Sequence, residues 1–467
     1  MSKSGVADVE DRKIVLVTGA NSGLGFSICC RLADEFLASR QNDNKTLTVI
    51  FTTRSTRKGS DTLRSLQAHL RSSSSSVRNP AAAASRVTFV PENADLCDLL
   101  SVRALSRRLN KDFPKLDAVI LNAGIGGWTG LNWPLAIWSI LTDLVHAVTW
   151  PTFKIAPAGQ ITEYQTSSVR DKEPRLGTVF CANVFGHYML AHNVMPLLHK
   201  AGSSNEDGNE LEPGRVIWVS SIEATVKAFD VEDIQGLRTE APYESSKALT
   251  DVLALTSDSP STEPWVKSFT SPSTSTSETN PTTTAPKTYL SHPGICSSSI
   301  VPLPTILIYC MLAATWLARM LGSPWHTLST YLGACAPVWL ALTPQSDLDV
   351  AESRYKHLGG GKVKWGSSST RSGKTFPAST EIDGWGFGGV VGAAVLSDDK
   401  ARRRKRGAAD LTAEAKERFE EAGRECWKQM EELRIEWEGI LDAEEREVGL
   451  VGCAPARALS MGMSSEI

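Results

Sequence analysis

Several features that would assign a function class at once are missing from this sequence. Its 467 residues include nine cysteines, but no pair has the C-x-x-C spacing of a zinc site or a redox centre. The formal net charge of −3 gives no general attraction to nucleic acid. The N-terminal stretch MSKSGVADVEDRK is polar and charged, and we expect no secretory signal peptide there. We therefore expect reduced thiols in a protein that faces the cytosol, with no metal site and no nucleic-acid partner.

The composition has the balance of a globular protein, with 41% hydrophobic and 22% charged residues. The length suits one large domain with insertions, or two domains. Helical patterns alternate with short, nearly continuous apolar runs, which is typical of strands in a parallel sheet covered on both faces. We predict an α/β fold with a doubly wound parallel sheet, whose six strands lie at 13–17, 47–52, 86–90, 116–121, 214–220 and 288–291.

Insertions of two kinds interrupt this pattern. The segments 71–85, 202–214 and 257–287 have low complexity, and we predict that they are surface loops. The segments 125–157 and 296–345 are apolar instead, and the first of them is rich in tryptophan.

The two apolar segments do not suit an ordinary soluble enzyme. The second contains a stretch, 301–321, that is about as long as a membrane-spanning helix. Packing in the core, or a greasy substrate pocket, would explain both segments without a membrane. A charge at Arg319, near the end of the stretch, suits a segment that lies in the bilayer interface as well as one that spans. We expect membrane association, with attachment to one leaflet ahead of spanning.

A different pattern begins near the C-terminus. The basic run ARRRKR at 401–406 is followed by a charged helix predicted at about 411–447. Apolar residues recur along one face of this helix, at Phe419, Cys426, Met430, Leu433, Trp437 and Ile440. Such a stripe docks a surface helix on its own domain, or presents it to a partner or a membrane. The basic run is either a solvated loop or a contact with anionic lipid head groups.

A nucleotide site is indicated after the first strand, in VLVTGANSGLG at 15–25. Gly19, Gly23 and Gly25 let the backbone turn sharply and approach a pyrophosphate closely. The helix that follows offers unpaired N–H groups to the phosphates. The spacing is Thr-Gly-x-x-x-Gly-x-Gly rather than Gly-x-Gly-x-x-Gly.

This spacing resembles that of the short-chain dehydrogenase/reductase family, and further motifs follow in the family's order. They are NADL (93–96), LNAG (121–124), FCANVFGHYML (180–190), WVSS (218–221), APYESSK (241–247) and HPG (292–294), so the resemblance covers about residues 13 to 300. It implies a Rossmann-like fold that binds a pyridine dinucleotide. The implied cofactor-binding residues are Gly19, Asn21, Ser22, Gly23, Leu24, Gly25, Thr53, Arg54, Asp95, Asn122, Tyr243, Lys247, Ile295 and Ser297.

The charge after the second strand bears on the choice of cofactor. An acidic residue there usually binds the free ribose 2′-hydroxyl of NADH, whereas the 2′-phosphate of NADPH is met by a cation. The second strand ends in TTRSTRK, which has three cations and no acid. Arg54 offers a planar fork that can hold a phosphate in two bonds, so we expect NADPH. The alternative is that these are solvated loop charges.

Tyr243 and Lys247 lie four residues apart and therefore on one face of a helix. The ammonium group, together with the positive nicotinamide of the oxidised cofactor, is expected to lower the tyrosine pKa. Tyr243 would then donate a proton to a ketone oxygen. The resemblance implies that Ser221 steadies this oxygen, with Ser220 as the competitor for that role. It also implies that Asn183 fixes a water molecule that links the lysine to solvent.

The substrate class follows from the resemblance. Ser221 and Tyr243 are 22 positions apart, a longer gap than in simple members of the family and similar to that of larger retinoid- and steroid-active members. With the apolar segments, the pattern resembles the sterol-active branch. It implies NADPH-dependent reduction of a 3-keto sterol to the 3β-hydroxy sterol during C-4 demethylation in ergosterol biosynthesis. It further implies residence on endoplasmic reticulum membranes or lipid droplets, with the catalytic domain facing the cytosol and other sterol enzymes as possible partners.

Two alternatives remain open. The first is a reductase of retinol-type or other lipid ketones at the same membrane. The second is a catalytically idle scaffold that organises sterol enzymes. In domain terms, we expect a reductase domain at 1–355, with the insertions 125–157, 257–287 and 296–345, and an extension at 356–467.

Overall fold

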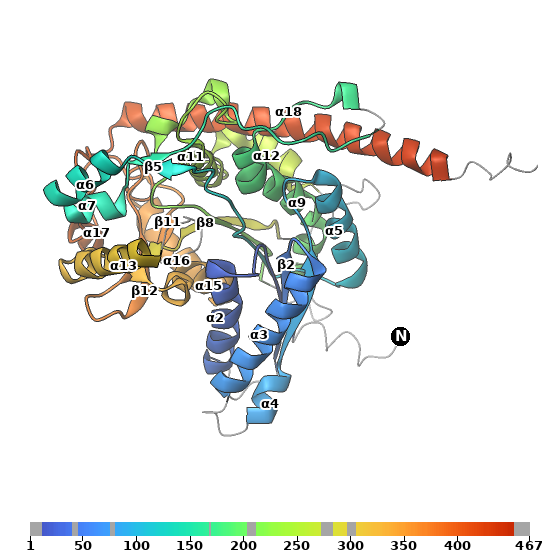
Figure 1. Ribbon diagram of the computed structural model, residues 1–467, viewed down its shortest axis with the longest axis horizontal. Coiled ribbons are helices and arrows are strands. Elements are labelled where there is room, and N and C mark those ends of the chain that lie inside the picture. Colours follow the sequence, from blue (N-terminus) through green and yellow to red (C-terminus); the bar gives the residue numbers. More distant parts are fainter. Residues whose placement is uncertain are drawn as a thin grey trace, which may run out of the picture.

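The computed structural model describes residues 12–39, 45–74, 80–167, 170–202, 212–271, 284–296 and 305–452. Its centre is an eight-stranded sheet with the order β12-β11-β8-β7-β4-β1-β2-β3. The strands are β1 (Arg12–Val17), β2 (Thr46–Thr53), β3 (Val87–Asn93), β4 (Ala118–Leu121), β7 (Arg215–Val219), β8 (Lys287–His292), β11 (Lys364–Ser369) and β12 (Thr375–Ser379). Helices cover both faces of this sheet (Figure 1).

All six predicted strands are present, and they run parallel to one another. Strands β4 and β7 are buried along their whole length, which explains their continuous apolar sequences. Side chains of β1 alternate between the two faces, so that Ile14 and Leu16 enter one core cluster and Val15 and Val17 enter the other. The predicted α/β fold with a mainly parallel central sheet is confirmed.

Two layers of helices enclose these two clusters. One face is covered by α2 (Gly23–Ser39), α3 (Thr56–Ser74), α15 (Cys335–Leu342) and α16 (Gln345–Lys356). The other carries α5 (Leu99–Asp112), α9 (Gly186–Asn193), α11 (Pro242–Leu255) and α18 (Ala413–Gly452). Shorter elements connect them: α4 (Pro80–Ser85), α8 (Thr178–Phe180), α10 (Met195–Ala201), α12 (Glu263–Thr270), α14 (Thr330–Gly333), α17 (Ser397–Lys400), β9 (Ile295–Cys296) and β10 (His326–Leu328).

Strands β11 and β12 lie beyond residue 355, in the part that we had set apart as an extension. β11 runs parallel to β8, and β12 runs antiparallel to β11. The sequence KWGSSS of β11 has no apolar run and therefore gave no indication of a strand. It is buried because its serines hydrogen-bond inside the fold. Ser367 Oγ, for example, donates to the Gly333 carbonyl and accepts from the Ala336 N–H.

Parts of two segments that we expected to be loops are helical. Helix α3 continues to Ser74 and α4 covers Pro80–Ser85, both within 71–85. Helix α12 lies within 257–287, where Phe269 packs against the rings of Tyr188 and Trp427 at centroid distances of 4.3 and 5.4 Å. The loop prediction was wrong there because one buried aromatic residue fixes a short helix whose composition is otherwise polar. Residues 203–211 and 272–283 lie outside the described residues.

The apolar segment 125–157 leaves the central sheet after β4 and forms a closed excursion. Its ends pair as the short antiparallel strands β5 (Gly130–Leu131) and β6 (Lys154–Ile155). Helices α6 (Trp133–Thr142) and α7 (Leu144–Thr149) form its tip, and α7 packs against α13 (Thr305–Met320). These three helices lie together at the left of Figure 1. In the described parts of the chain, no helix is both long and apolar enough to cross a membrane.

The long helix α18 runs along the upper side of the molecule in Figure 1. Its apolar stripe faces the core, with Met430 and Trp437 fully buried. A buried Arg434–Glu431 ion pair of 2.7 Å lies beside it, and the Tyr188 hydroxyl donates to Glu431. The basic run at 401–406 meets acids of the same chain, in the pairs Arg402–Asp399, Arg403–Asp143, Arg404–Glu381 and Lys405–Asp383.

Candidate active site

The glycine loop connects β1 to α2. Gly19 and Gly23 have positive φ angles of 70° and 60°, a conformation that favours glycine. A Cβ atom on Gly25 would lie 2.2 Å from the Gly19 carbonyl oxygen, so no larger residue fits there. Helix α2 begins at Gly23, and the first N–H groups of a helix have no partner within it. Of the other predicted loop residues, Asn21 and Ser22 are exposed and Leu24 packs against the core.

The loop is joined to the end of β4 through Thr18. The Thr18 hydroxyl accepts hydrogen bonds from the backbone N–H groups of Asn122 and Ala123, at 2.8 and 3.0 Å. The Asn122 amide donates to the Thr18 carbonyl at 3.0 Å, but its Oδ1 atom is buried and has no partner among the described residues. An acceptor left free beside a glycine cradle fits a dinucleotide that brings a donor to it.

The remaining predicted cofactor residues follow other strands. Thr53 ends β2 and is buried, while Arg54 comes next and is exposed. Asp95 follows β3, and its carboxylate accepts from the backbone N–H of Cys97. Ile295 begins β9. These positions lie at the carboxyl ends of parallel strands, where doubly wound folds bind their ligands. Ser297 lies outside the described residues.

Asn183 lies in a π-helical turn, residues 181–185, between α8 and α9. Such turns are rare and occur often at functional sites. Its Oδ1 accepts from the Ile125 N–H at 2.8 Å, and its Nδ2 donates to the Ile125 carbonyl and to Ser246 Oγ, both at 3.0 Å. The side chain therefore joins the loop after β4 to helix α11. These bonds go to the backbone and to a serine, so the expected water link to Lys247 stays a prediction.

Tyr243 lies in the first turn of α11, and its phenol is buried. Ser221 follows β7, and its side chain lies near enough to Tyr243 to act toward a lower tyrosine pKa. The ring of Trp128 lies at a centroid distance of 4.7 Å from the Tyr243 ring. The structure thus brings the predicted serine and tyrosine together, beside the base of the apolar excursion.

Lys247 lies one turn further along α11, with its ammonium nitrogen 5.9 Å from the centroid of the Tyr243 ring. This nitrogen donates to the Val219 carbonyl at 2.8 Å. Burial lowers the pKa of Lys247 to about 8, while Asp251 acts to raise it. The lysine therefore carries its charge at neutral pH and loses it in mildly alkaline solution.

The predicted lowering of the Tyr243 pKa is not found for the protein's own groups. Burial, followed by the nearby Glu223 carboxylate, raises this pKa above its ordinary value, and the contact with Ser221 opposes only part of the rise. The lysine does not act as expected because its ammonium group points to the end of β7. Tyr243 is consequently a neutral phenol that carries its proton at neutral pH.

The two serines after β7 have different contacts. Ser220 is buried, and its hydroxyl donates to Asp251 Oδ1 at 2.6 Å. It also lies 3.3 Å from the Lys364 ammonium nitrogen. The Ser221 hydroxyl accepts from the Glu223 N–H at 3.1 Å, and its side chain acts toward a lower Tyr243 pKa. Ser221 is therefore the serine that can meet a carbonyl oxygen beside the tyrosine.

A cluster of charged residues around the tyrosine was not predicted. Lys154, at the start of β6, forms ion pairs with Glu223 and with Glu244, the second of 2.8 Å. Its ammonium nitrogen lies 3.9 Å from the Trp128 ring centroid and 5.4 Å from that of Tyr243. The three charged residues are far apart in the sequence, so no local pattern reveals them. Only the position of Lys154, at the end of an otherwise nearly uncharged segment, sets it apart.

The fold and the site together are those of a short-chain dehydrogenase/reductase. No family model matches the sequence. The chain is 65% identical to the 3-keto-steroid reductase of Aspergillus fumigatus over 443 residues, which are 94% of this chain and 97% of that one. It is 40% identical to that of Gibberella zeae, over 93% of this chain and 96% of the relative, and 32% identical to that of Schizosaccharomyces pombe, over 80% and 91%. The chain belongs to this family of 3-keto-steroid reductases.

Solved structures resemble the chain only weakly. A 7α-hydroxysteroid dehydrogenase covers 73% of this chain and 91% of its own, with 14% identity and a TM-score of 0.38. Salutaridine reductase from Papaver somniferum covers 62% and 88%, with 18% identity and a TM-score of 0.35. Similarity at this level carries no inference on the site or the substrate.

Proposed function

We propose that the protein reduces a 3-keto sterol to the 3β-hydroxy sterol with NADPH, in the C-4 demethylation steps of ergosterol biosynthesis. The observation that carries this proposal is the convergence of Ser221, Tyr243 and Lys247 at the carboxyl end of β7, where the Lys247 ammonium nitrogen binds the Val219 carbonyl and lies 5.9 Å from the centre of the Tyr243 ring. The relatives at 65% and 40% identity bear the name of this activity.

The protonation states of the site suit reduction. When bound, NADPH supplies the hydride that reaches the sterol C3 carbon. Tyr243 keeps its proton because burial raises its pKa, and a phenol readily gives that proton to the far more basic alkoxide oxygen that forms. The Ser221 hydroxyl stabilises the same oxygen, and Lys247 would hold the nicotinamide ribose. The π bond of the C=O group is thereby replaced by one C–H bond and one O–H bond, and the C–O single bond remains.

The cofactor preference rests on Arg54. It is exposed directly after β2, and the stretch that follows contains no acid up to residue 60. A guanidinium group at this edge binds a 2′-phosphate and gains nothing from a 2′-hydroxyl. The test is turnover of a 3-keto sterol by the purified chain with NADPH and NADH side by side, for the native protein and for Arg54→Ala. We expect a clear NADPH preference that the variant loses. Equal use of NADH by the native protein would contradict it.

The two alternatives are separated by other measurements. A panel of retinoid, acyl and steroid ketones tests the alternative that the protein is a general lipid ketone reductase. We expect the highest kcat/KM for the 3-keto sterol. A cell that carries only the Tyr243→Phe protein tests the scaffold reading. We expect 3-keto sterols to accumulate there, while an unchanged sterol profile would favour the scaffold.

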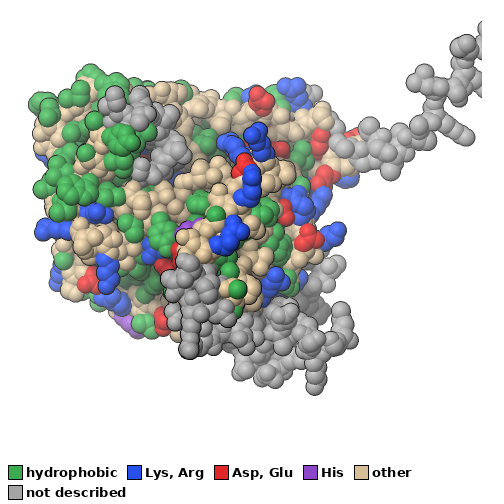
Figure 2. Space-filling view, turned by 60° about the horizontal axis from the view of Figure 1, so that its bottom comes forward, with side chains coloured by type: hydrophobic (Ala, Val, Ile, Leu, Met, Phe, Trp, Pro, Cys, Tyr) green, Lys and Arg blue, Asp and Glu red, His purple; other side chains and the backbone are tan. Residues whose placement is uncertain are grey.

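The apolar helices support a further part of the proposal, attachment to a lipid surface. Trp138 and Leu141 of α6 are 67% and 78% exposed, and Tyr309 of α13 is 68% exposed. Other large apolar side chains of the same helices are also exposed, namely Trp133, Ile137, Trp316, Leu317 and Met320, as is Leu321 directly after α13. Hydrophobic side chains gather at the left edge of Figure 2, the side on which α6 and α13 lie in Figure 1. A patch of this kind on a protein that takes a sterol suits a bilayer interface.

We propose that this patch places the enzyme on endoplasmic reticulum membranes or lipid droplets, with the sheet in the cytosol and other sterol enzymes nearby. Flotation with phospholipid vesicles tests the attachment. Trp138→Asp and Leu141→Asp should abolish it. Ile435→Asp serves as the control because Ile435 is 58% exposed on α18, away from the patch. Flotation that survives both changes in the patch would contradict the proposal.

A further inference from the structure

A buried polar network lies directly beneath the predicted catalytic serine. Lys364, the first residue of β11, pairs with Asp251 of α11 at 2.6 Å, and their side chains are 1% and 3% exposed. The Lys364 ammonium also donates to the Ser221 carbonyl at 2.7 Å. Ser220 completes the network because its hydroxyl donates to the same carboxylate.

The network joins three elements that carry the site. β7 ends at Val219 and delivers Ser221, α11 carries Tyr243 and Lys247, and β11 contributes the cation. Lys364 is aligned with Leu290 of β8, so the added strand is needed to bring its side chain under the end of β7. One ammonium group thereby fixes the backbone of Ser221 relative to the helix that presents the tyrosine.

Stability is a weak reason for such a pair. Taking two charges out of water costs several kcal/mol each, and well-packed apolar residues often serve the fold equally well. A buried pair that also holds the backbone of a reacting residue has a different use, because a displacement of 1 Å near the chemistry can cost about 100-fold in rate.

We infer that Lys364 and Asp251 are positioning residues for the reduction, which hold the Ser221 backbone and set the charge environment of Lys247. The inference rests on the proposed function for its reaction, and on the distances above for its residues. Neither residue touches the reacting atoms.

The second part concerns the groups that face Lys247. Asp251 lies one turn along the same helix and favours its charged form, while Lys364 from β11 opposes that form. His187 of α9 faces it as well, but burial lowers the pKa of this histidine to about 3 and keeps it neutral. The Val219 carbonyl accepts its hydrogen bond. Removing the Asp251 charge therefore makes the lysine lose its proton at lower pH.

The chain offers a matched control for Lys364 two residues earlier. Lys362 is also a buried lysine, with a side chain that is 7% exposed, and it donates to the Thr288 carbonyl and pairs with Asp258. The structure shows no hydrogen bond or ion pair between Lys362 and Ser220, Ser221 or Asp251. Lys362→Met and Lys364→Met thus remove the same group from the same segment, and only the second removes the link to the serine.

The experiment compares the full-length native protein with both variants in the reduction of a 3-keto sterol by NADPH. Binding of NADPH is measured by fluorescence, and stability by thermal unfolding. We expect Lys364→Met to lower kcat by about 10- to 100-fold with NADPH affinity within about threefold. Lys362→Met should lose less stability than Lys364→Met, because its partner Asp258 is 58% exposed, and should keep kcat within about twofold. Equal losses of kcat in the two variants would overturn the inference.

Two milder variants keep the inference testable if Lys364→Met does not fold. Asp251→Asn should move the alkaline limb of the kcat profile to lower pH, which a purely structural contact would not do. Ser220→Ala removes one hydrogen bond of the network and changes no charge. It should lower kcat several-fold without moving the alkaline limb. An unmoved limb in Asp251→Asn would contradict the inference. Native protein that turns over no 3-keto sterol would instead refute the proposed function, so the two failures can be told apart.

Discussion

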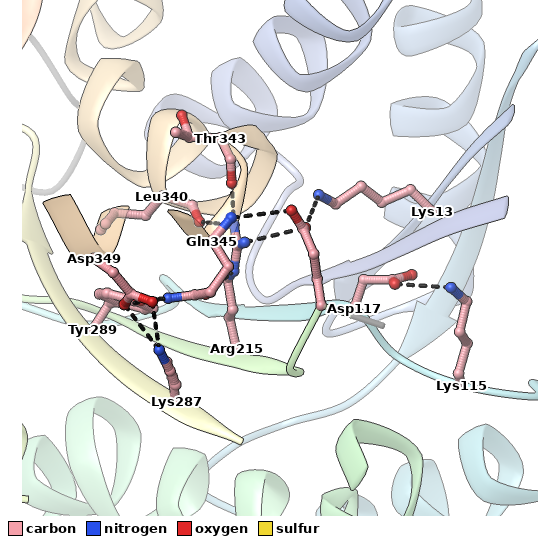
Figure 3. A network of polar contacts seen from close by, with 11 residues as sticks. Lys13, Lys115, Asp117, Arg215, Lys287, Tyr289, Leu340, Thr343, Gln345 and Asp349 are labelled. Atoms are coloured by element: carbon pink, nitrogen blue, oxygen red, sulfur yellow. Dashed lines mark hydrogen bonds and ion pairs between the residues drawn. The ribbon is translucent and has the colours of Figure 1, made fainter. Parts of the chain in front are cut away.

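Strand β7 has a buried cation at each end, and the two have different consequences. At its amino end, Arg215 donates to the Leu340 and Thr343 carbonyls at 2.8 and 2.7 Å, as Figure 3 shows. Beyond its carboxyl end, Lys364 donates to the Ser221 carbonyl. Arg215 and Ser221 are six residues apart along the chain, about 20 Å at ~3.3 Å per residue. Both satisfy backbone carbonyls from within the core, yet only one lies where parallel strands of this fold present their functional groups.

The network at the amino end has the features of a structural joint. Gln345 donates to the Tyr289 hydroxyl and to Asp349, and Lys287 pairs with the same aspartate (Figure 3). It binds the start of β7 and β8 to the helices α15 and α16. The network at the carboxyl end instead holds residues that we expect to meet the substrate. Similar chemistry therefore serves assembly at one end of the sheet and positioning at the other.

The sharpest test of this comparison uses two buried tyrosines. Tyr243→Phe removes the proposed proton donor, and general acid catalysis typically contributes about 10²- to 10⁴-fold, so we expect a loss of kcat of that order. Tyr289→Phe removes a buried hydroxyl from the amino-end network and should leave kcat within about twofold. Steady-state turnover of a 3-keto sterol measures both. Comparable activity of the two variants would erase the proposed difference between the two ends.

In the second test we expect a loss of stability with little change in kcat. Arg215→Met leaves the Leu340 and Thr343 carbonyls without their donor and should lower the free energy of unfolding by about 3 kcal/mol. The kcat of the folded protein should stay near the native value. Urea unfolding gives the stability, and turnover normalised to the folded fraction gives the rate. A loss of kcat that exceeds the loss of folded protein would show that this end also acts on the site.

Much of this arrangement could be predicted from the sequence, and the failures have a common cause. The six strands have apolar runs, and the structure contains a strand at each predicted place. The glycine loop, Ser221, Tyr243 and Lys247 have local motifs, so the sequence could single them out. Strand β11 was missed because KWGSSS carries no apolar run, and its burial depends on partners from distant segments. The protein's own groups raise the tyrosine pKa instead of lowering it, and the sequence missed this for the same reason. The Tyr243 pKa depends on burial and on the Glu223 carboxylate, and no local motif reveals either of them.

A smaller effect is expected where the apolar excursion meets the site. Lys154 binds Glu223 and Glu244 and lies against the rings of Trp128 and Tyr243. Lys154→Met should lower kcat/KM about tenfold, because the tyrosine ring and the base of the excursion lose a shared anchor. Lys154→Arg keeps the charge and should restore most of the activity. If the arginine variant is as poor as the methionine variant, the shape of the side chain matters and its charge does not.

The smallest effect is a dependence on pH that acts on rate and stability in opposite directions. Burial lowers the pKa of Lys247 from 10.5 to about 8, so the positive charge that we expect to hold the nicotinamide ribose is lost as pH rises through 8. We expect kcat to fall by a few-fold between pH 7 and pH 9.

Over the window from about 8 to 10.5, the unfolded chain holds the Lys247 proton and the folded chain does not, so this group favours the folded state more as pH rises. The stability of Lys247→Met should lack that increment when both proteins are unfolded in urea across this window. A kcat profile that stays flat to pH 10 would place the charge of Lys247 outside the chemistry, and the lysine would then belong with the structural cations at the other end of the strand.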